Sequence, residues 1–140
     1  MTRAAVVDAS VALKWVLPEE GSEAAANLRD TTLHAPQLLL VECGNALWAR
    51  VRRDLLSADE ARACFDLLST APVTLAPDAR LMPLALELAL EIDQTVYDCL
   101  YLALAVERDA ALVTADRRIC DAVRRHSDLE DRVSLLGAPS

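Results

Sequence analysis

The chain of 140 residues and 15.2 kDa is long enough for one domain with a substantial core. Hydrophobic residues make up 54% of it and aromatic residues only 4%, so we expect a core of Leu, Val and Ala. The net charge of −8 argues against broad electrostatic binding of nucleic acid. It does not exclude a nucleic-acid enzyme, because carboxylates that hold a metal ion add to the negative count.

The sequence also argues against a membrane protein and a zinc protein. No apolar run approaches the roughly 20 residues of a transmembrane helix, and the N-terminal segment reaches Asp8 too soon for a signal peptide. We therefore expect a cytoplasmic protein with no membrane contact. The four cysteines and two histidines lack the paired spacing of a zinc site, so we expect reduced thiols that pack as small apolar side chains.

Short apolar segments predict strands, and longer segments of helical periodicity separate them. The predicted strands are 4–8, 32–35, 72–76, 111–114 and 132–135. The predicted helices are 11–16, 19–30, about 37–53, 58 to about 68, 78–92, one that begins at 96, and about 116–126. This alternation predicts an α/β fold, a three-layer α/β/α sandwich on a mostly parallel sheet of about five strands, in a single domain over residues 1–140.

Several residues predict where helices begin. Ser10 is placed to cap the first helix, and Asp78 to cap the fifth. The segments 57–60 (SADE) and 95–98 (TVYD) match the capping box, in which an acid three residues after Ser or Thr completes the cap. Pro83 predicts that the fifth helix either begins near Met82 or kinks in its first turn.

Four acids follow or adjoin apolar sequence: Asp8, Glu42, Asp98 and Asp116. Parallel sheets place their sites at the carboxyl ends of strands, where Asp8 and Asp116 are expected. Acids brought together without a cation repel one another, and Mg²⁺ prefers carboxylate oxygens. Each acid also has a structural interpretation: Asp8 can end a strand, Glu42 can be a solvated helix acid, Asp98 can complete a capping box and Asp116 can cap a helix.

Segments spread in order over nearly the whole chain carry a family resemblance: 7–10 (VDAS), 35–47 around Glu42, 97–105 (YDCLYLALA) and 112–116 (LVTAD). With these segments the chain resembles PIN-domain ribonucleases, and most closely the VapC-type toxins of type II toxin–antitoxin pairs. The family's catalytic and metal-binding acids fall on Asp8, Glu42, Asp98 and Asp116. Its polar residues that hydrogen-bond these acids fall on Ser10, Asn45 and Thr114. Asp121 is a candidate for an additional acid, but its position is more typical of a helix surface.

The resemblance implies a Mg²⁺-dependent endoribonuclease, with Mn²⁺ as a substitute metal. Metal-activated water would hydrolyse RNA phosphodiesters and leave 3′-hydroxyl and 5′-phosphate ends. The family also implies a homodimer and a cognate antitoxin protein that inhibits the enzyme. The apolar segments 11–17 and 38–48 are candidates for the antitoxin contact.

Basic residues near the acids are candidates for contact with RNA: Arg117, Arg118 and Lys14. For the two arginines, the alternatives are a contact with an antitoxin or an ordinary basic helix end. Trp15 can stack on a base, although a core or dimer role is the better expectation.

Two other functions compete with the nuclease. One is a catalytically silent PIN-like interaction module, against which the full acidic set argues. The other is a Mg²⁺-dependent phosphotransfer domain. That class expects a second acid two residues after Asp8, where Ser10 stands, and a lysine after a late strand, whereas Lys14 is the sole lysine.

Overall fold

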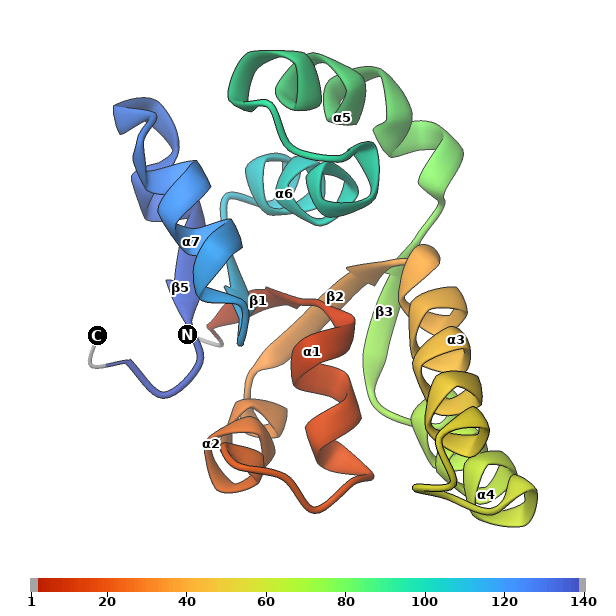
Figure 1. The fold of residues 1–140 in the computed structure, drawn as a ribbon. Coiled ribbons are helices and arrows are strands. Elements are labelled where there is room, and N and C mark those ends of the chain that lie inside the picture. Colours follow the sequence, from red (N-terminus) through yellow and green to blue (C-terminus); the bar gives the residue numbers. More distant parts are fainter. Residues whose placement is uncertain (1–2, 139–140) are drawn as a thin grey trace.

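The computed structural model describes residues 3–138, which form a five-stranded sheet in the order β3-β2-β1-β4-β5 (Figure 1). All neighbouring strands are parallel. The strands are β1 (Ala4–Val7), β2 (Thr32–Pro36), β3 (Val73–Ala76), β4 (Ala111–Thr114) and β5 (Val133–Leu135). The predicted α/β sandwich with five parallel strands is confirmed.

Helices cover both faces of this sheet (Figure 1). The helices are α1 (Ala9–Ala12), α2 (Ser22–Asn27), α3 (Leu38–Arg52), α4 (Ala58–Ser69), α5 (Asp78–Ile92), α6 (Val96–Arg108) and α7 (Arg117–Arg124), with short 3₁₀ segments at Leu13–Trp15, Leu28–Asp30 and Ser127–Arg132. Helix α6 packs on β1, β2 and β4, while α5 packs on α6 and α7 on β5. On the other side, α1 contacts α3, and α4 packs against α3. No helix among residues 3–138 is both long and apolar enough to cross a membrane.

Strand β1 lies at the centre of the sheet and is buried on both faces. Val6 belongs to the main core with α6, whereas Ala5 and Val7 belong to a smaller core that includes Val11 and Ala25. This double burial explains why the segment is apolar without alternation. It also places Asp8, the next residue, in the middle of the edge where the parallel strands end.

The cysteines behave as predicted. All four are free thiols, and Cys43, Cys99 and Cys120 are buried. Burial raises the pKa of Cys43 to about 12 and that of Cys99 to about 11, so both stay protonated and act as small apolar groups.

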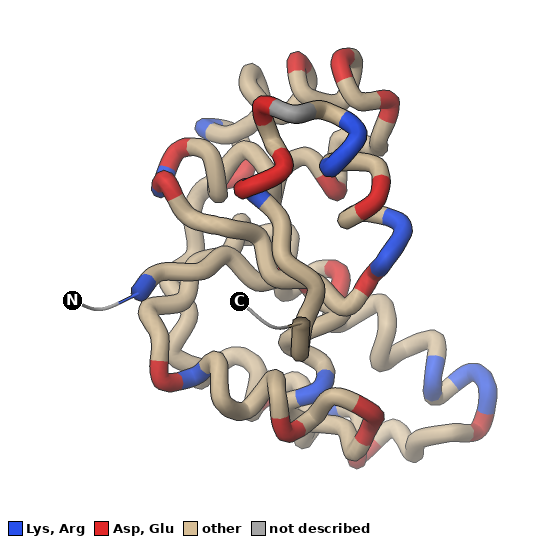
Figure 2. The backbone as a smooth tube through the Cα atoms, turned by 90° about the vertical axis from the view of Figure 1, so that its left-hand side faces the viewer, with Lys and Arg blue, Asp and Glu red and all other residues tan. Residues whose placement is uncertain are grey.

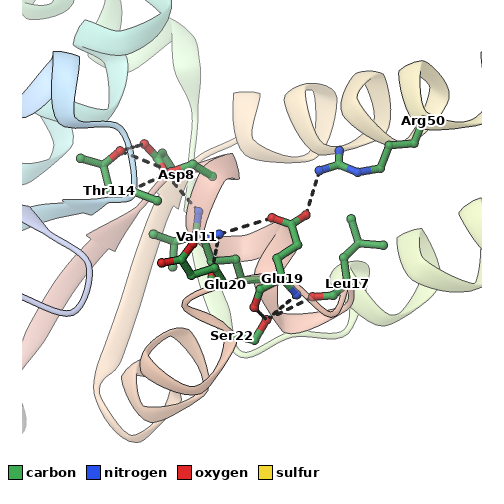
Figure 3. Close-up of polar contacts among 11 residues, drawn as sticks. Asp8, Val11, Leu17, Glu19, Glu20, Ser22, Arg50 and Thr114 are labelled. Carbon is green, nitrogen blue, oxygen red and sulfur yellow. Dashed lines mark hydrogen bonds and ion pairs between the residues drawn. The ribbon is translucent and has the colours of Figure 1, made fainter. Parts of the chain in front are cut away.

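The first two helices begin at residues other than those predicted. The cap of α1 is Asp8, whose carboxylate accepts the Val11 N–H, and Ser10 lies inside the helix. Helix α2 begins at Ser22, after Gly21 in a left-handed conformation (φ 87°), and not at Glu19. Glu19 instead lies in a loop, where a tertiary ion pair with Arg50 holds it (Figure 3).

Of the other predicted helix starts, that of α4 is confirmed and that of α5 differs. Ser57 and Glu60 form the full capping box of α4. Helix α5 spans Asp78–Ile92 and includes Pro83, so it does not begin near Met82. The carboxylate of Asp78 does not cap its own helix: it accepts the N–H of Leu38 at 3.0 Å and so caps α3, 40 residues away.

The Asp78 contact predicts a measurable loss of stability. We expect Asp78→Ala to lower the free energy of unfolding by about 1 kcal/mol, because an N–H in the first turn of α3 loses its acceptor, whereas Asp78→Asn keeps an acceptor and loses less. Urea unfolding followed by circular dichroism measures both. The matched control is Asp59→Ala, a first-turn acid of α4 whose exposed pair with Arg62 contributes little. Equal effects of the two alanine variants would contradict the assigned contact.

Candidate active site

Asp8 lies at the centre of the candidate site, with its side chain almost entirely buried (7% exposed). Its Oδ1 accepts hydrogen bonds from the Ser10 hydroxyl at 2.5 Å and from the Val11 N–H at 3.3 Å. Its Oδ2 accepts one from the Thr114 hydroxyl at 2.5 Å (Figure 3). The carboxylate is therefore fixed from helix α1 and from the end of strand β4 at once.

The same hydroxyl groups also position the segment that carries Asp116. The N–H of Ala115 donates to the Ser10 hydroxyl oxygen at 2.9 Å, and the N–H of Asp116 donates to the Thr114 hydroxyl oxygen at 3.1 Å. The register that pairs Val7 with Val113 brings these two strand ends side by side. Asp8 and Asp116 therefore follow two paired parallel strands, at the same edge of the sheet.

Asp116 uses its two carboxylate oxygens differently. Oδ1 accepts the Arg118 N–H at 2.9 Å and so caps α7, as one of its predicted interpretations required. Oδ2 lies 3.4 Å from Nη2 of the Arg118 guanidinium, whose side chain is 79% exposed. An ion pair this open to solvent is weak, so a metal ion can displace the guanidinium from Asp116.

Asp98 lies in the first turn of α6 and is half-buried. The Thr95 hydroxyl oxygen accepts the Asp98 N–H at 3.1 Å. The return bond that would complete a capping box, from the Thr95 N–H to the Asp98 carboxylate, is absent among the hydrogen bonds of the described residues. Thr95 thus fixes the backbone of Asp98, and the charges of Arg118 and Asp116 both act on its carboxylate.

Glu42 lies in the second turn of α3, and its partner comes from α6. The Tyr101 hydroxyl donates to Glu42 Oε1 at 2.5 Å. Burial first, and then the neighbouring Glu42, raise the pKa of Tyr101 far above its usual range, so the hydroxyl stays protonated and donates. Tyr101 is not among the site residues predicted from the sequence. Its spacing of three residues from Asp98 was the signal that placed it on the same side of α6.

The four acids act on one another electrostatically. Burial away from solvent raises the pKa values of Asp8, Glu42 and Asp98 from their ordinary values. The charge of Asp98 further raises the pKa values of Asp8 and Glu42, and the charge of Asp116 raises that of Asp98. Hydrogen bonds from Ser10 and Thr114 lower the pKa of Asp8 and so oppose the rise that burial causes. The acids thus form one connected set, gathered from four separate elements.

The donor set fits a hard divalent cation that keeps part of its water. Between residues 3 and 138, no three Asp, Glu, His or Cys side chains stand close enough together to bind a single ion as a closed cage. Mg²⁺ does not require such a cage, because it commonly binds one or two carboxylates together with waters and substrate phosphate. An open group of mutually repelling carboxylates therefore fits Mg²⁺ or Mn²⁺, whereas it lacks the nitrogen and sulfur ligands of a zinc site.

The other predicted site residues lie farther from the carboxylates. Asn45 is exposed one turn after Glu42 and lines the same shallow hollow as Tyr97, and its side chain makes no hydrogen bond to the acids in the described structure. Lys14 is engaged by other groups, with its ammonium group 3.3 Å from the Glu19 carboxylate and 2.7 Å from the Glu20 carbonyl.

Charged residues are spread over the whole backbone and are not gathered on one face (Figure 2). Arg117 and Asp121 are both exposed on α7.

The Trp15 indole N–H donates to the Ala25 carbonyl at 2.8 Å, and its ring is partly buried against both cores. The expected core role of Trp15 agrees with this placement.

Comparisons with known proteins agree with this geometry. The model of the PIN domain family matches residues 5–125. Ribonuclease VapC3 of Pyrobaculum aerophilum is 37% identical over 120 residues, which cover 83% of this chain and 92% of the relative. Ribonuclease VapC9 of Mycobacterium tuberculosis is 34% identical over 116 residues, covering 83% of this chain and 88% of the relative.

Solved structures share the fold. PAE2754 from Pyrobaculum aerophilum superposes with a TM-score of 0.68 at 25% identity, covering 86% of this chain and 79% of its own. VapC20 of Mycobacterium tuberculosis, a toxin that cleaves the sarcin-ricin loop, gives a TM-score of 0.65 at 16% identity over 84% of this chain and 94% of its own. VapBC2 from Rickettsia felis, bound to a promoter DNA fragment, gives a TM-score of 0.67 at 13% identity, covering 94% of this chain and 98% of its own. The chain therefore belongs to the PIN-domain family and, within it, to the VapC ribonucleases.

Proposed function

We propose that this protein is the endoribonuclease toxin of a toxin–antitoxin pair, and that it hydrolyses RNA with the help of Mg²⁺ or Mn²⁺. The observation that carries the proposal is that three acids from three other elements, Glu42, Asp98 and Asp116, form a connected electrostatic set with the buried, fixed carboxylate of Asp8 at the end of the central strand. Its relatives are named ribonucleases, which supports RNA as the substrate.

In this proposal Asp8, Asp98 and Asp116 would share the binding of one or two metal ions whose remaining ligands are water and substrate phosphate, and Glu42 would be a further ligand or orient water. A bound Mg²⁺ supplies an activated water and neutralises charge on the reacting phosphate. The carboxylate of Asp8 can accept about four bonds and receives three from the protein, so it keeps capacity for a cation. Because water and not the ribose 2′-hydroxyl attacks, the products are a 3′-hydroxyl and a 5′-phosphate.

The structure disfavours the phosphotransfer alternative in two places. Ser10 stands where that class has its second acid, and its hydroxyl donates to Asp8. Lys14 pairs with Glu19 and so does not reach toward the acids. The silent interaction module is disfavoured because a fold without catalysis gains nothing from buried carboxylates whose charges oppose one another.

The partners follow from the same proposal. We infer a cytoplasmic toxin that forms a homodimer and is inhibited by a short antitoxin, which a neighbouring reading frame should encode. Segment 11–17 contributes little to such a contact because Val11, Leu13 and Leu17 are buried in the core. The α3 segment is the better candidate, since Trp48 is 58% exposed beside an apolar groove between α3 and α4.

The central prediction concerns cleavage. Asp8→Asn and Asp98→Asn should each lower Mg²⁺-dependent cleavage of RNA by more than about 100-fold, because each removes a charged metal ligand while keeping its shape. Gel analysis of labelled RNA, with circular dichroism to confirm folding, measures this. The control Asp59→Asn changes an exposed acid on α4 and should cleave normally. Fragments that end in a 2′,3′-cyclic phosphate would rule out the proposed water attack.

A second prediction concerns stability and pH in the metal-free protein. Because folding raises the pKa of Asp8, the native state binds more protons than the unfolded chain at pH values just above the ordinary pKa of an aspartate. The free energy of unfolding therefore falls as the pH rises through this region. Asp8→Asn removes this loss, so its melting temperature should rise relative to wild type between pH 4 and pH 7. Adding Mn²⁺ at pH 7 should stabilise wild type more than the variant. A constant difference at all pH values would contradict the assignment.

A third prediction concerns RNA contact. We expect the Arg118 guanidinium to leave Asp116 when metal binds and to meet a phosphate. With metal present and an RNA analogue that the enzyme cannot cleave, Arg118→Ala should weaken RNA binding several-fold and lower the slope of log affinity against log salt by about 1. Fluorescence anisotropy with labelled single-stranded RNA measures both. Arg124→Ala, on another face of α7, is the control, and an equal loss there would show only a general charge effect.

A further inference from the structure

We propose that Tyr101 is a positioning residue that holds Glu42 in the acid site, and so sets the affinity of that site for a divalent metal. This inference rests on the proposed function, in which Glu42 serves the metal. It assigns a role to a buried side chain that supplies no ligand itself.

The contact joins two distant helices. Tyr101 belongs to α6 and is only 2% exposed, while Glu42 belongs to α3, 59 residues earlier. Figure 1 shows α3 and α6 as separate helices. The hydrogen bond of 2.5 Å from the Tyr101 hydroxyl to Glu42 Oε1 therefore spans the site from one helix to the other.

The spacing on α6 makes this bond useful. Asp98 and Tyr101 are three residues apart and so are neighbours on one side of the helix. Asp98 contributes its own carboxylate on this side of α6, and Tyr101 holds the carboxylate of Glu42 by its hydrogen bond. The charges of Asp98 and Asp8 both raise the pKa of Glu42, which agrees with a Glu42 carboxylate directed toward these two acids.

The bond also restricts where Glu42 can point. A glutamate in the second turn of a helix has several side-chain conformations, and Glu42 lines an open hollow into which it could turn. If it did, the buried Tyr101 hydroxyl would lose its acceptor, which is costly. Only Oε1 is engaged among the hydrogen bonds of the described residues. Oε2 is thus left for a metal or its water while the rest of the side chain is held.

The test is binding of Mn²⁺ alone to the full chain, without RNA, followed by the electron paramagnetic resonance signal of free Mn²⁺. We expect Tyr101→Phe to weaken Mn²⁺ binding about tenfold, because Glu42 loses its tether while the ring and its packing remain. Tyr97→Phe is the matched control, since it removes a hydroxyl from an exposed tyrosine of the same helix. It should bind Mn²⁺ as wild type does.

A double-mutant cycle separates positioning from packing. In a Glu42→Ala background, Tyr101→Phe should change Mn²⁺ affinity less than twofold, because there is no carboxylate left to hold. If the tenfold loss persists in that background, Tyr101 acts through general structure and the inference is wrong. It is also wrong if Tyr101→Phe binds Mn²⁺ as tightly as wild type while Asp98→Asn does not. If Asp98→Asn also leaves Mn²⁺ affinity unchanged, the proposed metal site itself fails, and the inference with it.

Discussion

The burial of one carboxylate, that of Asp8, is the constraint on which the rest of this structure depends. An ionised group at the end of a central strand is costly to remove from water unless donors replace the water. Here the Val11 N–H and the Ser10 and Thr114 hydroxyls supply them. The same bonds cap α1 and tie it to the end of β4, so the elements that build the fold are also those that fix the first acid of the site.

The other acids add a cost that folding alone does not explain. Asp98 and Glu42 are partly buried. The charges of Asp98 and Asp8 raise the pKa of Glu42, and the charge of Asp116 raises the pKa of Asp98, whereas neutral side chains would carry no such repulsion. Proteins keep such conflicts mainly at functional sites. A divalent cation would offset the repulsion and turn a destabilising cluster into a ligand set. The open arrangement of the carboxylates, with no closed cage among the described residues, is consistent with a metal that also binds water and phosphate.

Much of this arrangement was predictable from the sequence, for a physical reason. Strand β1 is a continuous apolar run and β4 is apolar up to Thr114. The parallel topology places the residues that follow such strands at one edge, so Asp8 and Asp116 could be expected at the same edge of the sheet. What could not be predicted are the side-chain partners that only tertiary packing brings together. Asp78 was expected to cap its own helix by a local rule but caps α3, 40 residues away. Glu19 was expected to open a helix but pairs with Arg50.

The acids of the site show the same division between local and distant control. Asp8 and Asp116 have short side chains at strand ends, where backbone geometry and adjacent N–H groups hold them. Local sequence can specify such positions, and their motifs are correspondingly easy to recognise. Glu42 has a longer side chain on a helix, and its backbone leaves the direction of the carboxylate open. Its orientation depends on a phenol 59 residues later, so the order of the site depends on how closely α3 and α6 are held together.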